Sequence, residues 1–484
     1  MNYYKGDNMC GIIGIQGVEP IAEALYHGML QLQHRGQDAS GVFLSDPAIS
    51  DPMLRKRSGW VFQLFQEEPA LQKARWGLGH IRYSTSGKGQ IRDAQPLTIK
   101  KQNHTLAIVH NGNLVNYTIL RDELEREGAV FQTTCDSESI LHLLSQNLSL
   151  DKPFFETLCQ AVSKVYERVS GSYSIIGMVT GYGMFAFRDP RGIRPLLLGK
   201  GNQLFAIASE TVALSNIGCK GIQDIMPGEV VWLDPNGDLH QRRLVCLKKH
   251  SHCAFEFNYF AKTPSVMEGK EIYAIRSELG RLLAEKILTL NLPPIDVVVP
   301  IPETGNPAGI ALAQRLKVPF AEGFIRNQHS GRTFIIADSD KRKAASIQKL
   351  VPIRSVFEGK TVLLVDDSII RGTVSKSTIS LARNPGAKKI LFASTFPPVL
   401  FPCIYGIDFP CKEQLIAASK SLIEITQELG ADAVIYNDLE TLKRAIGLDD
   451  LCLACVTGSY PTSTEGMERL QQLREQDLYP VGSL

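Results

Sequence analysis

The chain has 484 residues, of which 44% are hydrophobic, 52 are basic and 50 are acidic, so its formal net charge is +2. That length supports about two or three domains, each with its own core. The balanced charge gives no reason to expect nucleic acid or a membrane surface as a partner, and no apolar stretch approaches the roughly 20 residues that span a bilayer. We therefore expect a cytoplasmic protein that acts on small molecules.

A short leader, residues 1–9, precedes the sequence Cys10-Gly-Ile-Ile-Gly. If this leader is removed, Cys10 carries both a thiol and a free α-amine with an ordinary pKa of about 8, so one residue supplies a nucleophile and its base. The plainer alternative is a buried cysteine that opens a first strand. Whether translation starts at Met9 or a propeptide is cleaved stays open.

The first half of the chain, residues 10–245, reads as short strands with a few helices. Short runs rich in apolar residues predict strands over residues 106–110, 173–179, 184–187 and 204–207. Helical periodicity is confined to residues near 21–33, 137–147 and 154–169. This mixture predicts antiparallel sheets covered by helices.

Four polar clusters interrupt this half at strand ends or in loops. They are His34-Arg-Gly-Gln-Asp, Gly79-His-Ile-Arg-Tyr-Ser-Thr, His110-Asn-Gly-Asn and Thr133-Thr-Cys-Asp-Ser-Glu. Arg82 and Asp136 could hold the α-carboxylate and α-ammonium of an amino-acid amide. The Asn111 side chain and the Gly112 N–H could stabilise the oxyanion that forms when a thiolate attacks that amide. Each cluster also has a plainer alternative, since Asp136 could cap a helix and Asn-Gly is a common turn pair.

From about residue 268 onward, predicted strands and helices alternate. Strands are expected over residues 296–300, 361–365 and 389–394, and helices over residues 307–316 and 374–383. This alternation predicts a doubly wound parallel sheet. The change of pattern places a domain boundary near residues 243–260, which divides the chain into residues 10–245 and 246–484.

The strongest signal of the second half lies at the end of the strand expected over residues 361–365. The chain continues there as Asp366-Asp-Ser-Ile-Ile-Arg-Gly-Thr before the next helix. Helix N–H groups, the hydroxyls of Ser368 and Thr373 and a close backbone approach at Gly372 would bind a phosphate. Asp366 and Asp367 would then face a ribose diol and Mg²⁺. The plainer alternative is a solvated Asp-Asp turn.

A Cys-x-x-Cys pair, Cys452 and Cys455, lies near the end of the chain. By itself it could be a redox dithiol, half of a zinc site or a coincidence. The ten cysteines of the chain are not expected to form structural disulfides in the cytoplasm.

Residues 10–240 resemble the glutaminase domain of class II, N-terminal-nucleophile amidotransferases. The resemblance is carried by the Cys10-Gly-Ile-Ile-Gly, His34, Gly79 and His110 motifs and by residues 188–196. It implies an αββα sandwich in which Cys10 is nucleophile and base, Asn111 and Gly112 assist catalysis, and Arg82 and Asp136 bind glutamine. It also implies that the leader must be lost.

Residues 362–373 resemble the fingerprint of type I phosphoribosyltransferases, and the whole chain is similar to the glutamine phosphoribosylpyrophosphate amidotransferase family. In that family, ammonia released from glutamine crosses an internal channel and displaces pyrophosphate from phosphoribosyl pyrophosphate, giving 5-phosphoribosylamine for purine biosynthesis. The resemblance implies phosphoribosyl pyrophosphate ligands at Asp366, Asp367, Ser368, Arg371, Gly372, Thr373 and Arg332. It implies Mg²⁺ ligands at Thr304, Asp366 and Asp367. The polar segment over residues 326–350 is the candidate for a lid that closes over this site, although a plain solvated loop would have the same composition.

One branch of this family also places a [4Fe–4S] cluster on four cysteines, which correspond here to Cys253, Cys403, Cys452 and Cys455. Such a cluster would crosslink the end of the chain to its core. The resemblance further implies a homotetramer that purine nucleotides inhibit.

Two stretches depart from the family pattern. Ile301-Pro-Glu-Thr-Gly stands where Val-Pro-Asp-Ser-Gly is common, and Arg326-Asn-Gln-His-Ser-Gly-Arg stands where Lys-Asn-Arg-Tyr-Val-Gly-Arg is common. Arginine and lysine differ in how they bind phosphate. A specialised paralogue, an amidotransferase with another ammonia acceptor, and a non-catalytic regulator that binds phosphoribosyl pyrophosphate or nucleotides therefore stay open as alternatives.

Overall fold

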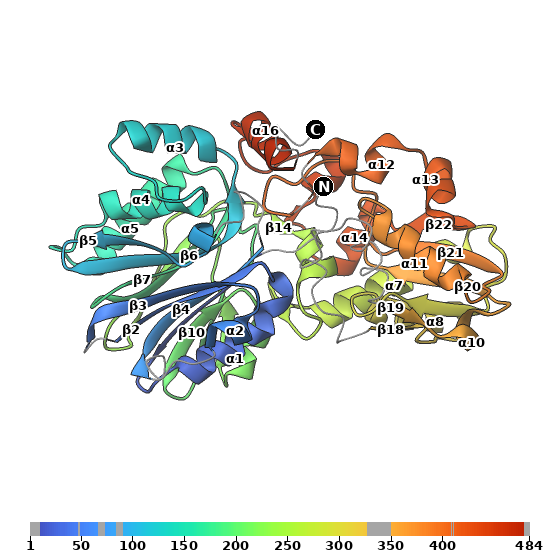
Figure 1. The fold of residues 1–484 in the computed structure, drawn as a ribbon, viewed down its shortest axis with the longest axis horizontal. Helices are drawn as coiled ribbons and strands as arrows, with labels where there is room; N and C mark the ends of the chain where they lie inside the picture. The colour runs from blue at the N-terminus through green and yellow to red at the C-terminus, as the bar shows by residue number, and fades with distance from the viewer. Residues whose placement is uncertain are drawn as a thin grey trace.

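Two lobes lie side by side in the computed structural model, which describes residues 10–46, 49–65, 73–83, 91–326, 350–407, 409 and 411–478 (Figure 1). The first lobe comprises the described residues up to Arg243, and the second begins at His252. The last helix, α16 (Met467–Leu478), returns to the first lobe, where Arg469 pairs with Asp122 of α3 at 2.8 Å. Most of the lid expected over residues 326–350 lies outside the described residues, as does Arg332.

The first lobe contains two antiparallel sheets. The strand order of the seven-stranded sheet is β11 (Lys220–Asp224), β9 (Leu197–Lys200), β10 (Leu204–Ala208), β1 (Gly11–Gly17), β4 (Trp76–Arg82), β2 (Ala39–Asp46) and β3 (Ile49–Ser58). The order of the six-stranded sheet is β13 (Leu239–Arg243), β12 (Glu229–Leu233), β8 (Gly183–Arg188), β7 (Gly171–Val179), β6 (His104–Leu114) and β5 (Leu97–Lys101).

Apolar side chains from the facing sides of the two sheets form one core, which includes Ile12, Trp76, Val109 and Ile176. The outer face of the larger sheet is covered by α1 (Ala22–Leu32) and α6 (Thr211–Asn216). The outer face of the smaller sheet is covered by α3 (Tyr117–Arg126), α4 (Ser137–Asn147) and α5 (Phe154–Arg168). These four layers confirm the expected αββα sandwich.

The second lobe is built on a parallel sheet, also as expected. Its strand order is β17 (Val297–Pro300), β20 (Thr361–Asp366), β21 (Lys389–Ser394) and β22 (Ala433–Tyr436). One face packs against α7 (Ile272–Leu288) and α8 (Asn306–Leu316), and the other packs against α11 (Thr373–Arg383) and α13 (Leu422–Leu429). Helices on both faces explain why these strands are apolar throughout.

Shorter elements connect these layers. The helices are α2 (Val61–Phe65), α10 (Arg354–Phe357), α12 (Ile416–Ser419), α14 (Leu439–Ile446), α15 (Ala454–Thr457), the 3₁₀ turns η1 (Gln33–Arg35), η3 (Ile91–Asp93) and η6 (Lys412–Gln414), and the π-helical turn η4 (Glu256–Phe260). The strand pairs are β14 (His252–Cys253) with β23 (Leu451–Cys452), β15 (Val266–Met267) with β16 (Lys270–Glu271), and β18 (Phe324–Arg326) with β19 (Leu350–Pro352).

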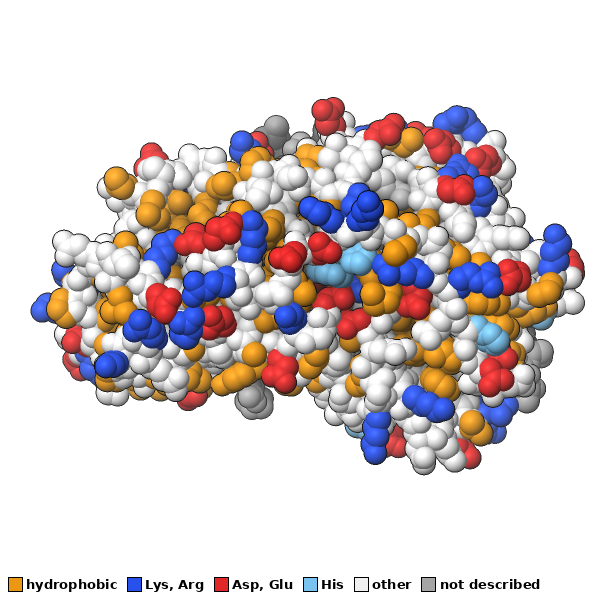
Figure 2. Space-filling model, turned by 180° about the vertical axis from the view of Figure 1, so that it is seen from behind, with side chains coloured by type: hydrophobic (Ala, Val, Ile, Leu, Met, Phe, Trp, Pro, Cys, Tyr) orange, Lys and Arg blue, Asp and Glu red, His pale blue; other side chains and the backbone are white. Residues whose placement is uncertain are grey.

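The surface agrees with the balanced composition. On the face shown in Figure 2, basic and acidic side chains are interspersed over both lobes, and neither sign dominates. In the part of the chain that the structure describes, no helix is long and apolar enough to cross a bilayer.

A buried ion network joins the two lobes. The guanidinium of Arg35 in η1 donates to both carboxylate oxygens of Glu256 in η4, at 3.2 and 2.8 Å, and its Nε donates to Glu210. Arg35 and Glu210 have no exposed surface, and only 1% of Glu256 is exposed. Burial alone would raise the pKa of Glu210, but Arg35 and His34 hold it well below its usual range. The charges of Arg35 and Glu256 are therefore fully compensated only when both lobes are in place.

We expect Arg35→Met to destabilise the protein by about 3–5 kcal/mol, because it takes the shared cation away from two buried carboxylates. Denaturant unfolding monitored by fluorescence measures this change. The exposed pair Arg354–Glu358, at 2.6 Å, provides the control, and Arg354→Met should leave the unfolding midpoint unchanged. Equal midpoints for the two variants would contradict this account of the interface.

Candidate active sites

Cys10 lies at the start of β1, a central strand of the seven-stranded sheet. The register pairs Gly11 with Ile81, which places Cys10 beside the end of β4. Its Sγ donates to the carbonyl oxygen of Tyr83 at 3.7 Å. Burial raises the pKa of the Cys10 thiol to about 11, although the Tyr83 hydrogen bond and Arg82 oppose this effect. The thiol is therefore protonated at neutral pH and needs a base to become a nucleophile.

Arg82 and Asp136 both lie in the surroundings of this thiol. Their charges act on the Cys10 pKa in opposite directions, Arg82 lowering it and Asp136 raising it. Asp136 is the N-cap of α4, where its carboxylate accepts hydrogen bonds from the N–H groups of Ser137 at 2.8 Å and Leu114 at 2.9 Å. The helix-cap alternative is therefore correct as local structure, and it is compatible with a carboxylate held beside Cys10.

Asn111 and Gly112 lie on β6. Asn111 is 1% exposed, and neither atom of its side-chain amide has a hydrogen-bond partner among the described residues. Leaving a buried polar group unpaired costs about 1–3 kcal/mol, so this amide is suited to a partner that arrives with a ligand. Gly112 has a φ of 153°, and a Cβ there would lie 2.0 Å from the carbonyl oxygen of Ser172. Only glycine fits this position.

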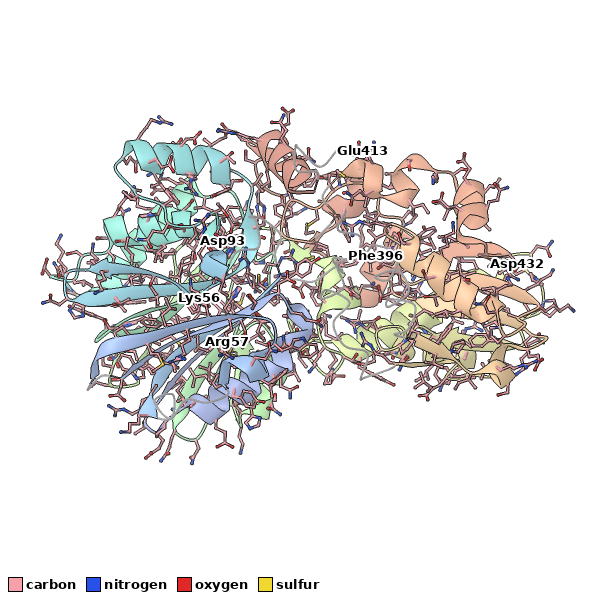
Figure 3. The ribbon with its side chains drawn as sticks, viewed as in Figure 1. Lys56, Arg57, Asp93, Phe396, Glu413 and Asp432 are labelled. Atoms are coloured by element: carbon pink, nitrogen blue, oxygen red, sulfur yellow. The ribbon has the colours of Figure 1, made fainter. Side chains whose placement is uncertain are left out.

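Two residues near the first site are not predicted from the sequence. Asp93, which is labelled in Figure 3, accepts hydrogen bonds from the N–H and hydroxyl of Thr134, at 2.9 and 3.1 Å. It therefore holds the loop that carries Asp136. His80 is fully buried, neither ring nitrogen has a hydrogen-bond partner within the described ranges, and burial lowers its pKa well below the ordinary value. Its place in the Gly79-His-Ile-Arg motif is the signal that could have found it.

The second site lies at the carboxyl end of β20. Asp366 ends the strand, and the carboxylate of Asp367 accepts hydrogen bonds from the hydroxyls of Thr304 at 2.5 Å and Ser368 at 2.7 Å. Burial raises the pKa of both aspartates, and the charge of Asp367 raises that of Asp366 further. A cation bound beside them would remove this penalty. Thr304, Asp366 and Asp367 thus fit an oxygen-ligand site for Mg²⁺.

The loop after Asp367 leads into α11. Gly372 has a φ of 77° and is followed by Thr373, the first residue of the helix, so N–H groups gather at this end. Arg371 donates through Nε to the side chain of Gln414 at 2.9 Å. The structure thus brings together Ser368, Gly372 and Thr373 in one loop, whereas Arg332 lies outside the described residues.

The π-helical turn η4 links the second site to η1, which packs beside the residue that follows Cys10, since a Cβ at Gly11 would lie 3.5 Å from that of Arg35. Its Glu256 binds Arg35, and its Asn258 donates to the carbonyl oxygen of Asp367 at 3.0 Å. Phe396 donates its N–H to the same carbonyl at 3.0 Å, and Figure 3 shows it at the side of the second lobe that faces the first. No sequence pattern points to this turn.

Arg326, the one described residue of the second departure from the family pattern, meets the first departure in space, whereas residues 327–332 lie outside the described residues. Arg326 lies 3.7 Å from Glu303, and both side chains are exposed. The next residue, Thr304, still reaches Asp367 with its hydroxyl. The longer carboxylate at position 303 therefore leaves the contact between this loop and the second site intact.

The four expected cluster cysteines converge in the second lobe. The β14–β23 register pairs Cys253 with Cys452, and the carbonyl oxygen of Cys455 accepts from Leu400 and Phe401 in the segment that leads to Cys403. All four are at most 9% exposed and none is in a disulfide. Burial raises the pKa of Cys253 to about 11, although the charge of Arg194 opposes this effect. Within the described ranges, however, no three His, Cys, Asp or Glu side chains are grouped closely enough to hold a metal ion.

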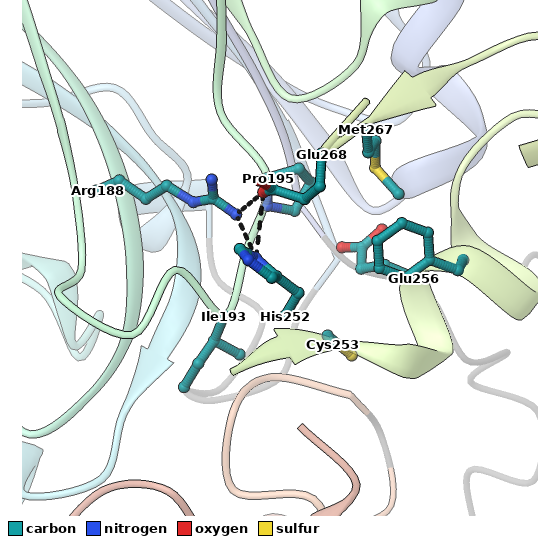
Figure 4. Close-up of a pocket in the computed structure, with 9 residues that line it drawn as sticks. Arg188, Ile193, Pro195, His252, Cys253, Glu256, Met267 and Glu268 are labelled. Atoms are coloured by element: carbon teal, nitrogen blue, oxygen red, sulfur yellow. Dashed lines mark hydrogen bonds and ion pairs between the residues drawn. The ribbon is translucent and has the colours of Figure 1, made fainter. Parts of the chain in front are cut away.

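Beside Cys253 lies a second buried ion group between the lobes (Figure 4). Glu268 is 2.6 Å from Arg188 of β8 and 3.1 Å from His252. Burial alone would raise the pKa of Glu268, but Arg188 and His252 lower it to about 2. The ion pairs of Glu268 with Arg188 and His252 therefore form a further contact between the lobes, next to Cys253.

Comparisons with known proteins cover both lobes. A family model described as a glutamine amidotransferase domain matches residues 80–216, and one described as a phosphoribosyl transferase domain matches residues 268–397. An amidophosphoribosyltransferase of Pasteurella multocida is 37% identical, covering 97% of this chain and 96% of its own length.

Two solved structures match with a TM-score of 0.84 and 35% identity, and each covers 94% of this chain. One, of which 98% is covered, is the Bacillus subtilis glutamine phosphoribosylpyrophosphate amidotransferase complexed with ADP and GMP. The other, of which 97% is covered, is described as the allosteric regulatory enzyme of purine biosynthesis. With similarity to such relatives along nearly its whole length, the chain belongs to the amidophosphoribosyltransferase family.

Proposed function

We propose that this protein transfers the amide nitrogen of glutamine to phosphoribosyl pyrophosphate, giving 5-phosphoribosylamine, glutamate and pyrophosphate for purine biosynthesis. The observation that carries the proposal is the connection of two differently built sites through η4. One site has a cysteine beside an unpartnered buried amide, and the other has paired carboxylates at a helix N-terminus. Cleaving an amide and displacing pyrophosphate require these two kinds of site.

In the first half-reaction, Arg82 and Asp136 hold the α-carboxylate and α-ammonium of glutamine. Once residues 1–9 are removed, the α-amine of Cys10 takes the thiol proton, and the sulfur attacks the side-chain amide carbon. Asn111 and Gly112 donate to the oxyanion. The α-ammonium of Cys10 returns the proton to the leaving nitrogen, the C–N bond breaks as ammonia leaves, and water hydrolyses the thioester to glutamate.

In the second half-reaction, ammonia attacks C1 of the sugar while the bond from C1 to the pyrophosphate oxygen breaks. Ser368, Arg371, Gly372, Thr373 and Arg332 bind the phosphates. Thr304, Asp366 and Asp367 would hold Mg²⁺, which supplies charge neutralisation for the leaving pyrophosphate when bound. Asn258 supports this loop from behind through the Asp367 carbonyl.

The two half-reactions divide the chain into a leader at residues 1–9, a glutaminase domain at residues 10–245 and a phosphoribosyltransferase domain at residues 246–484. Nucleotide inhibition is supported by the ADP and GMP complex of the B. subtilis relative. The homotetramer and the cytoplasmic location stay predictions. We further propose that Cys253, Cys403, Cys452 and Cys455 ligate a [4Fe–4S] cluster. All four are buried, and the other three act on the pKa of Cys455, which supports their nearness. Iron binding would convert these thiols to the thiolates that such clusters use as ligands.

We expect Cys10→Ala to abolish glutamine-dependent synthesis of 5-phosphoribosylamine while sparing synthesis from free ammonia, since only the first site loses its nucleophile. Pyrophosphate release with each nitrogen source measures this. Asp366→Asn provides the opposite control and should reduce both activities. Loss of both activities in Cys10→Ala would contradict the assignment of glutamine cleavage to the first site and of synthesis from ammonia to the second.

Asn111→Leu should abolish glutamine hydrolysis without lowering the unfolding temperature, because it removes an oxyanion donor and also an unpaired buried amide. Asn113→Leu is the matched variant, since that amide donates to Ile404 at 2.9 Å and its loss should cost about 1–3 kcal/mol. Calorimetry compares the two. A lower unfolding temperature for Asn111→Leu than for Asn113→Leu would contradict the interpretation that the Asn111 amide is unpaired until a ligand binds.

Anaerobically purified protein should be brown and contain labile iron and sulfide. Cys452→Ser should remove the colour, whereas Cys246→Ser, which changes an exposed cysteine, should keep it. Iron, sulfide and zinc analysis measures the outcome. Stoichiometric zinc in place of iron would contradict the iron–sulfur assignment.

A further inference from the structure

A turn of the second lobe packs directly against the strand that carries Asn111 and Gly112. This turn, residues 403–407, is called the cysteine turn below. The side-chain amide of Asn113 donates to the carbonyl oxygen of Ile404 at 2.9 Å, and the Ser172 hydroxyl donates to that of Tyr405 at 2.9 Å. These donors belong to neighbouring strands, because the β6–β7 register pairs Asn113 with Ser172.

The hydroxyl of Ser172 makes a second hydrogen bond that continues this contact into the strand. It accepts from the backbone N–H of Asn113 at 3.2 Å while it donates to Tyr405. The guanidinium of Arg194 donates to the same Tyr405 carbonyl, at 2.6 Å from Nη2 and 3.2 Å from Nε. Ser172 and Arg194 have no exposed surface. Water therefore does not compete for these bonds, and the carbonyl of Tyr405 is fixed from two sides.

The contact reaches Gly112 itself. A Cβ at Gly406 would lie 3.0 Å from the carbonyl oxygen of Gly112, and a Cβ at Gly112 would lie 2.0 Å from the carbonyl oxygen of Ser172. The backbone of Gly112 is thus enclosed between β7 and the cysteine turn. A shift of either neighbour would move the N–H of Gly112 relative to Cys10.

We infer that Ser172 and Asn113 are positioning residues that use the cysteine turn to hold the two oxyanion donors in place. This inference rests on the roles proposed for Asn111 and Gly112. Oxyanion donors act only within a narrow distance range, and a misplacement of about 1 Å costs roughly 100-fold in rate. Cleavage of glutamine in the first lobe therefore depends on backbone carbonyls supplied by the second.

Ser172→Ala tests this inference in the full-length protein. It removes the bond to Tyr405 and leaves the N–H of Asn113 without its acceptor. We expect kcat for glutamine hydrolysis to fall about tenfold, a fraction of the effect of deleting a donor. The KM for glutamine should change less than about twofold, because Arg82 and Asp136 are untouched, and synthesis from free ammonia should stay at the parent level.

Two further variants separate positioning from general destabilisation. Ser172→Thr keeps a hydroxyl and should retain more hydrolysis than Ser172→Ala. Ser170→Ala is the control, since Ser170 also bonds across to the end of the chain, to Ser463 at 3.0 Å, but on the exposed rim. It should leave kcat unchanged. If Ser172→Ala does not fold, Asn113→Ala should show the same split between kcat and KM.

Equal loss of glutamine-dependent and ammonia-dependent synthesis in Ser172→Ala would overturn the inference, as would unchanged kcat or an effect confined to KM. Failure of the site assignment gives a different result. In that case Cys10→Ala would keep its glutamine hydrolysis in the same assay.

Discussion

The paired charges of Arg35 and Glu256 set the relation between the two lobes. A fully buried guanidinium that binds two carboxylates, one from each lobe, tolerates little displacement, because any separation leaves charge without compensation in a dry interface. A hydrophobic contact of similar area would permit sliding. The charged one also specifies orientation, since both N–H groups of the fork must meet both oxygens.

This constraint passes to both sites through η4. Glu256 and Asn258 lie two residues apart in one π-helical turn, so the residue that binds Arg35 and the residue that binds the Asp367 carbonyl move together. Arg276 strengthens the turn by donating to the carbonyl oxygens of Phe257, Tyr259 and Ala261. π-Helical turns are rare and often occur at functional positions. Here the turn holds Arg35 of the first lobe and the Asp367 loop of the second lobe at a fixed relative position.

Much of this architecture could be predicted from the sequence, because it depends on local pattern. The short apolar runs at residues 173–179 and 361–365 identify their strands, and the loop over residues 366–373 is found from its hydroxyls and glycine. Asp136 shows the limit of this approach. Its position predicts both a cap and a ligand, and the sequence offers no means of choosing between two roles that one carboxylate can combine.

The contacts between lobes could not be predicted in this way. Asn113 and Ile404 are 291 positions apart in the chain. The acceptor is a backbone carbonyl, which every residue has, so the sequence does not indicate which residue accepts the hydrogen bond. The π-helical turn has no periodicity over so few residues. The pairing of Cys253 with Cys452 comes only from the family resemblance, because nothing local marks two distant cysteines as neighbours.

The long separation of Asn113 from Ile404 has a consequence for the protein during its synthesis. At about 5–20 residues per second, Ile404 leaves the ribosome roughly 15–60 s after Asn113. Until then the first lobe folds without the carbonyls that complete its outer edge. The oxyanion donors of a nascent chain therefore lack this support until the second lobe has been synthesised, so the glutamine-cleaving centre gains its full activity last.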